Sequence, residues 1–137
     1  MIDLSDLISK ETLAHVRARA LANNVGWKDS IYGQQPLTNP PKPYVRLELP
    51  ISVAGYEHSG RPDGTSVRLQ FSAFTLTDGN GTEDIFAISN ALSGYMNSFE
   101  SVALIVIECE YVGTVYRRTA DGGHMAAVEF RLTAMKG

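Results

Sequence analysis

The chain has 137 residues, of which 44% are hydrophobic and 20% charged, and its formal net charge is −3. This length fits one domain spanning residues 1–137, and the composition excludes intrinsic disorder, which combines low hydrophobicity with high net charge. The 12 basic residues are dispersed among 15 acidic ones, so we expect no sequence-specific nucleic-acid partner.

The N-terminus and the single cysteine predict a cytoplasmic protein. Asp3 and Asp6 stand where a signal peptide would carry positive charge. The longest apolar run, residues 102–107, is far shorter than the ~20 residues of a membrane helix, so no membrane partner is expected. Cys109 lies in an apolar stretch, as a buried thiol in a reducing compartment does. The carboxylates on either side of it are expected to raise the pKa of the thiol.

The first predicted element is a helix over residues 3–24. Asp3 or Ser5 can cap its start, and the Asn-Asn-Val-Gly run at residues 23–26 supplies stop signals. We expect a kink near residues 9–12, because it would bring two apolar stripes onto one side of the helix. The stripes are Leu4, Leu7 and Ile8, then Leu13, Val16, Ala20 and Leu21.

Two strands are predicted after a proline-rich connection at residues 26–43. Apolar and polar residues alternate over residues 44–53 and again over residues 65–77, so each strand buries one face. Pro50 lacks the N–H that a strand ladder needs, which places the first strand at a sheet edge near its end. Between the two strands, residues 54–64 form a polar, glycine-rich loop.

A second helix follows the turn at residues 78–81. Thr82 can cap this helix. Two further strands, residues 102–117 and 124–135, are joined by a tight turn at residues 120–123. The apolar residues of the second helix recur at helical spacing as Ile85, Ile88, Leu92 and Met96.

The element order α-β-β-α-β-β predicts the fold class. We expect an α+β domain in which a four-stranded, mainly antiparallel sheet carries two helices packed on one face, because that arrangement buries every apolar stripe. The predicted core comprises Val45, Leu47, Leu69, Phe71, Ile88, Leu92, Val106, Val128 and Phe130.

No motif along the chain predicts an active site or a cofactor. The Gly-Asn-Gly turn at residues 79–81 precedes a helix, but a dinucleotide-binding loop needs a glycine where Asp84 stands. The three histidines, His15, His58 and His124, have no i,i+4 partner of the kind that forms a zinc site. We therefore expect a protein that is not an enzyme and binds no cofactor.

Two carboxylates in the third predicted strand leave an alternative open. Glu108 and Glu110 are two residues apart and share one face of the strand. With His124 on the neighbouring strand, they could hold a metal ion weakly. They could instead belong to a solvated sheet face, or pair with Arg117 and Arg131 on the adjoining strand.

Short segments distributed over the chain carry a family resemblance. They are residues 43–45 after the proline-rich lead-in, residues 67–74, and residues 91–92 at the end of the second helix. An Arg-x-x-Asp-Gly hairpin and a strand ending in Phe-Arg-Leu follow, with the matching residues Arg118, Asp121, Gly122, Phe130, Arg131 and Leu132. Over residues 4–132, these segments resemble the tail-completion or tail-terminator proteins of long-tailed bacteriophages. The loop at residues 54–64 departs from that family in being longer and more charged.

The resemblance implies a structural subunit that closes into a ring, a homohexamer, which caps the tail tube and provides the surface for head–tail joining. Its partners would be copies of itself, the tail-tube protein and a head-completion or neck protein. It would be found in the cytoplasm of the bacterial host during assembly and then in the virion. The residues expected to contact these partners lie in the loop and the hairpin: Tyr56, His58, Arg61, Arg117, Arg118 and Asp121.

Two other functions fit the same sequence. Another neck component, such as a head-completion or minor capsid protein, would share this size and composition. A small-molecule-binding domain or an enzyme would use the open face of the sheet, and a deep apolar pocket would favour that function.

Overall fold

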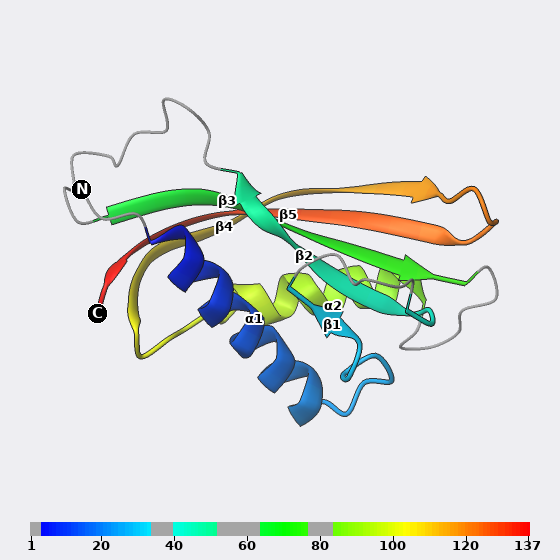
Figure 1. The fold of residues 1–137 in the computed structure, drawn as a ribbon, viewed down its shortest axis with the longest axis horizontal. Coiled ribbons are helices and arrows are strands. Elements are labelled where there is room, and N and C mark those ends of the chain that lie inside the picture. Colours follow the sequence, from blue (N-terminus) through cyan, green and yellow to red (C-terminus); the bar gives the residue numbers. More distant parts are fainter. Residues whose placement is uncertain (1–3, 34–39, 52–63, 77–83) are drawn as a thin grey trace.

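The computed structural model describes residues 4–33, 40–51, 64–76 and 84–137, which form two helices and a five-stranded sheet (Figure 1). Every helix and strand predicted from the sequence is present, and the bounds differ by a residue or two. In chain order the elements are α1 (Ser5–Ala22), β1 (Ile31–Tyr32), β2 (Tyr44–Ile51), β3 (Gly64–Thr75), α2 (Ile85–Asn97), β4 (Leu104–Arg118) and β5 (His124–Lys136).

The sheet has the strand order β1-β2-β3-β5-β4. All neighbouring strands are antiparallel except β1, which runs parallel to β2 through the pairs Ile31–Val45 and Tyr32–Arg46. The predicted four-stranded sheet therefore lacked one strand, and the sheet is mixed. The missing strand, β1, lies in the connection at residues 26–43, and a two-residue strand is too short to show the alternation that would reveal it.

Both helices cover the same face of the sheet, as predicted (Figure 1). α2 lies against β3, β4 and β5, whereas α1 contacts β1, β2 and α2. The cap of α2 is Asp84, whose carboxylate accepts a hydrogen bond from the N–H of Phe86 at 2.8 Å. The predicted cap, Thr82, falls outside the described residues. Neither helix combines the length and the apolar content that crossing a membrane requires.

α1 is one helix with a single buried stripe. The predicted kink is not needed, because Thr12 joins the two apolar stripes into one. Thr12 interrupts the apolar pattern in the sequence, although its side chain is fully buried, and Leu21 from the second predicted stripe is exposed. The stripe consists of residues four positions apart: Ile8, Thr12, Val16 and Ala20.

The core lies between the helices and the sheet. It contains the nine predicted residues, of which eight are buried and Val106 is partly buried. Phe71 of β3 and Phe130 of β5 meet edge to face, with 6.1 Å between their ring centroids. Trp27 is a core residue that the sequence did not predict. It is 1% exposed although it lies in the irregular connection before β1, where no periodicity marks the buried positions.

Candidate assembly interface

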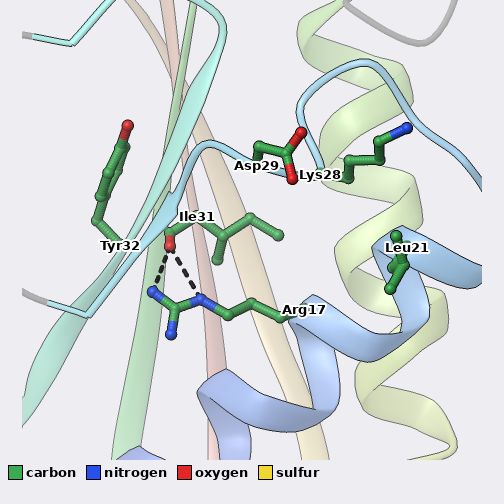
Figure 2. Close-up of a pocket in the computed structure, with 6 residues that line it drawn as sticks. All are labelled: Arg17, Leu21, Lys28, Asp29, Ile31 and Tyr32. Carbon is green, nitrogen blue, oxygen red and sulfur yellow. Dashed lines mark hydrogen bonds between the residues drawn. The ribbon is translucent and has the colours of Figure 1, made fainter.

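The two edges of the sheet are built differently. At one edge, β1 is two residues long, and the carbonyl oxygen of Ile31 accepts two hydrogen bonds from Arg17, at 3.1 Å from Nε and 2.7 Å from Nη2 (Figure 2). The same edge continues along β2 beyond Arg46, the last residue that pairs with β1, and Pro50 lies in this part of β2. A short strand protects a sheet edge from pairing with another chain.

The other edge is β4, which has fifteen residues and pairs with β5 alone among the described strands. It contains neither proline nor lysine. A long edge strand with exposed apolar side chains is typical of a protein–protein interface. Of the ten exposed large apolar side chains among the described residues, six belong to β4, and we call these six the β4 surface: Ile105, Ile107, Tyr111, Val112, Val115 and Tyr116.

Two tyrosines of the β4 surface are held in place by their neighbours. The ring centroid of Tyr116 lies 4.8 Å from that of Phe86 in α2, and its hydroxyl shares a hydrogen bond of 2.8 Å with Ser89. The ring centroid of Tyr111 lies 5.8 Å from that of Phe130. Because these side chains are already ordered, a partner that binds them loses less conformational entropy on association.

The predicted contact residues fall into described and undescribed parts of the chain. Arg117 and Arg118 are the last two residues of β4, and both are exposed. Tyr56, His58 and Arg61 lie outside the described residues. The structure therefore places two of the predicted contacts on the same edge strand as the β4 surface, at the end that leads into the hairpin turn.

Asp121, the last predicted contact, is bound within its own subunit. Its carboxylate accepts hydrogen bonds from Lys42 at 2.6 Å, from the hydroxyl of Thr119, and from the N–H of Gly123 at 3.2 Å. The hydrogen bond from Lys42, followed by those from Thr119 and Gly123, holds the pKa of Asp121 well below its usual range. Asp121 thus ties the β4–β5 hairpin to the segment before β2, and the two arginines are the more available contacts.

The register of β4 and β5 separates the residues of the alternative metal site. Glu110 lies opposite Arg131, and its Oε2 is 4.0 Å from Arg131 Nη1, which is the predicted pairing of a carboxylate with Arg131. His124 is seven positions before Arg131, and this odd separation in a regular strand places it on the opposite face. Arg117, the other predicted partner, lies opposite Met125 near the hairpin. In residues 4–33, 40–51, 64–76 and 84–137, no three His, Cys, Asp or Glu side chains are grouped to hold a metal ion.

Burial raises the pKa of the Cys109 thiol to about 11. The residue is half-buried and lies opposite Leu132, on the helix side of the sheet. The predicted rise is confirmed, but its cause is burial, because strand alternation directs the neighbouring Glu108 and Glu110 to the other face. A thiol with so high a pKa is a poor nucleophile at neutral pH.

Two cavities test the alternative prediction of a small-molecule-binding site. The smaller, about 40 Å³, lies between α2 and β4 and has room for water only. The larger, about 430 Å³, has charged residues in its lining, and the guanidinium of Arg17 there already binds the Ile31 carbonyl oxygen (Figure 2). Neither is a deep apolar pocket on the open face of the sheet. The larger hollow is lined by Arg17, Leu21, Lys28, Asp29, Ile31 and Tyr32.

Comparison with known proteins gives a likeness in fold. No model of a protein family matches the chain, and no curated protein matches it. Among solved structures, a chain of the "Virion of native gene transfer agent (GTA) particle" is similar, with a TM-score of 0.62 and 14% sequence identity. The match covers 94% of this chain and 94% of that chain. At this identity the likeness shows a shared fold, from one end of the chain to the other.

Proposed function

We propose that this protein is a structural subunit of a phage-type virion, and specifically a tail terminator. The observation that carries the proposal is the end-to-end fold likeness to a chain in the virion of a gene transfer agent particle. The tail-terminator role rests in addition on the sequence resemblance over residues 4–132. A protein of this kind acts through the surfaces that it presents to its neighbours.

The β4 surface supports a role in assembly rather than in catalysis. It joins exposed apolar side chains, ordered tyrosine rings and two arginines on one edge strand. Interfaces are enriched in tyrosine and arginine, which combine a large contact area with hydrogen bonding. The described residues thus offer a contact surface, whereas Cys109, their one thiol, is a poor nucleophile.

In the proposed assembly, copies of the subunit close into a ring of six on the end of the tail tube. The other side of the ring meets a head-completion or neck protein. Closed rings of more than two copies use heterologous contacts, in which one surface meets a different surface of the next copy. We assign Arg117 and Arg118 to one of these surfaces, and the loop at residues 54–64 remains the predicted second contact.

The proposal is tested by deleting the gene from the particle that encodes it. We expect tails that are over-long or detached from heads, and restored joining when purified protein is added. The double substitution Arg117→Glu and Arg118→Glu should abolish this rescue. The matched control is Lys10→Glu with Arg19→Glu, which changes the net charge equally at exposed positions of α1 and should still rescue. If particles made without the gene still carry tails of normal length joined to heads, the terminator role is wrong.

A second candidate is another neck component, either a head-completion or a minor capsid protein. It is favoured by the same observation, because a shared fold does not specify a place within the virion. The deletion separates the two candidates. Free tails of normal length beside defective heads would point to the neck component, whereas over-long tails point to the terminator.

A further inference from the structure

The two helices leave part of the helix side of β4 exposed. α1 lies over β1 and β2, whereas α2 lies over β3, β5 and part of β4 (Figure 1). Tyr111 and Tyr116 of β4 are on the helix side, because their partners in β5 are buried in the core. Both tyrosines are nevertheless exposed, and so is Phe86 of α2, whose ring contacts that of Tyr116. We call these three exposed side chains the aromatic face.

The outer side of α1 also carries apolar residues that its own subunit leaves exposed. Ala14, Ala18 and Leu21 follow one another at spacings of four and three residues, so they share one side of the helix. All three are exposed. Leu21 is 65% exposed, and among the described large apolar side chains it is the exposed one that belongs to α1. This side of α1 therefore offers an apolar contact to another molecule.

We propose that the outer side of α1 in one copy packs on the aromatic face of the next copy. The inference rests on the proposed ring and names the two surfaces that meet in it. Leu21 packs against Tyr116, and α1 continues along β4 toward Tyr111. The lengths of the two surfaces agree. From Ala14 to Leu21 the helix rises about 10 Å, and from Tyr111 to Tyr116 the strand extends about 13 Å when the one bulged residue between them is left out.

The positions of the two surfaces make this contact heterologous. α1 lies at the β1 edge of the sheet, and the aromatic face lies at the β4 edge, at the other end of the strand order. A contact between opposite edges repeats in the same sense from copy to copy, as a closed ring requires. β1 has two residues, and the Ile31 carbonyl oxygen already accepts two hydrogen bonds from Arg17. We therefore expect neighbours to meet through the helix layer rather than through a shared sheet.

Charged residues beside the two surfaces are complementary. Arg118 follows Tyr116 by two positions in β4, so it lies on the same side of the strand. Asp29 lies near Leu21 in the lining of the larger cavity (Figure 2). Both Asp29 and Arg118 are exposed, and neither forms an ion pair with a described residue. Packing of Leu21 on Tyr116 brings Asp29 to Arg118 of the next copy.

The two cations in the lining of the same cavity are already bound within the subunit. Arg17 donates to the Ile31 carbonyl oxygen, and Nζ of Lys28 donates to Oδ1 of Asn24 at 2.5 Å. Asp29 is therefore the charge in this lining that lacks a partner among the described residues.

Two complementary variants test the contact and its heterologous character. In sedimentation experiments on the full chain, the wild type should associate reversibly beyond the dimer as its concentration rises. Leu21→Glu and Phe86→Glu should each weaken the association by about tenfold or more, because each buries a carboxylate in an apolar contact. A mixture of the two variants should associate again but stop at a 1:1 dimer, since each variant keeps one intact surface.

The matched control is Val102→Glu, at a fully exposed apolar side chain that belongs to neither surface. This variant should associate as the wild type does, and circular dichroism will show that every variant is folded. If Leu21→Glu associates as the wild type does, or if the mixture stays monomeric, the proposed contact is wrong. A wild-type chain that remains monomeric at every concentration also overturns it.

Charge exchange tests how the two surfaces are aligned. Asp29→Arg and Arg118→Glu should each weaken the association by about threefold, because each brings like charges together. Combined in one chain, the two changes should restore the association to within about twofold. Asp6→Arg with Arg118→Glu exchanges the same charges at the other end of α1 and should stay weak. If this control is restored instead, the proposed alignment is wrong.

The contact and the tail-terminator role are tested separately. If gene deletion gives over-long tails while the mixture of variants stays monomeric, the contact is wrong and the role stands. If the mixture forms the expected dimer while the deletion leaves tails of normal length joined to heads, the contact stands and the role is wrong.

Discussion

β4 and β5 are the two strands of one hairpin, yet β4 begins with an apolar run that is partly exposed, whereas the more polar β5 buries one whole face. The start of β4, Leu-Ile-Val-Ile, is among the most apolar parts of the chain, and Ile105 is 54% exposed. β5 alternates polar and apolar residues, and every second side chain from Ala126 to Ala134 is buried. The reason is position, because β5 lies between β3 and β4, whereas β4 has one neighbour among the strands that the structure describes. The apolar content of a strand therefore indicates that burying its side chains would be favourable. The position of the strand in the sheet decides whether its own domain buries them.

The largest expected effect comes from the buried strand. Phe130→Ala removes a ring that is 2% exposed and packs against Phe71, so the free energy of unfolding should fall by about 3–5 kcal/mol. Tyr111→Ala is the matched change on β4, where the side chain is 51% exposed, and it should cost clearly less. Denaturant titration measures both. Equal losses would contradict the contrast between the two strands.

A smaller effect is expected at the turn that joins the two strands. A Cβ atom at Gly123 would clash with the backbone carbonyl oxygen of Thr75, so Gly123→Ala should destabilise the fold by about 1–3 kcal/mol. Gly113→Ala in β4 is the control, because a Cβ there meets nothing within 4 Å. Its effect should stay within about 0.5 kcal/mol. If both variants unfold at the same denaturant concentration, the close approach at Gly123 carries no cost.

Asp121 adds a pH-dependent link between the hairpin and the segment before β2. Its pKa is lowered in the folded state, chiefly by the hydrogen bond from Lys42, so its stabilisation is present above the unfolded-state pKa of about 4 and is lost as pH falls below it. Asp121→Asn should therefore lower the thermal midpoint at pH 7, and the difference from wild type should narrow toward pH 3. Asp6→Asn, at an exposed position of α1, controls for the loss of one surface charge. If the difference in thermal midpoint between Asp121→Asn and wild type is as large at pH 3 as at pH 7, the charge of Asp121 is not the cause of its stabilisation.

The smallest effect on stability is expected on the β4 surface itself. Val115 is 55% exposed, so Val115→Ser should change the free energy of unfolding by less than about 0.5 kcal/mol. The same change in β5, Val128→Ser, buries a hydroxyl in the core and should cost more than about 2 kcal/mol. Val115→Ser should instead weaken the rescue of head–tail joining by the purified protein. A stability loss at Val115 comparable to that at Val128 would mean that the β4 surface is covered within its own subunit.

Much of the fold could be read from local patterns. Alternation in residues 44–53 and 124–135 and the helical spacing from Ile85 to Met96 locate their elements within a residue or two, because each pattern reports one face turned to a core. The α1 stripe was harder to read, since Thr12 is polar and yet fully buried. β1 was missed, because two residues have no period and the strand depends on hydrogen bonds to distant residues, among them Val45 to Ser30.

The candidate interface shows the same division. Arg117 and Arg118 were recognised from the sequence as charged residues at a hairpin, and they are exposed. The role of Asp121 was not, since its partner Lys42 is 79 positions away. The sheet order makes β4 an edge, and this order depends on which strands pair with one another rather than on any segment alone. The sequence by itself thus determined the helices, the long strands and their buried faces, because the spacing of apolar residues along a helix or strand decides which side chains lie on one face. Only the tertiary structure decided which apolar strand is left uncovered, because that depends on which strands lie beside it.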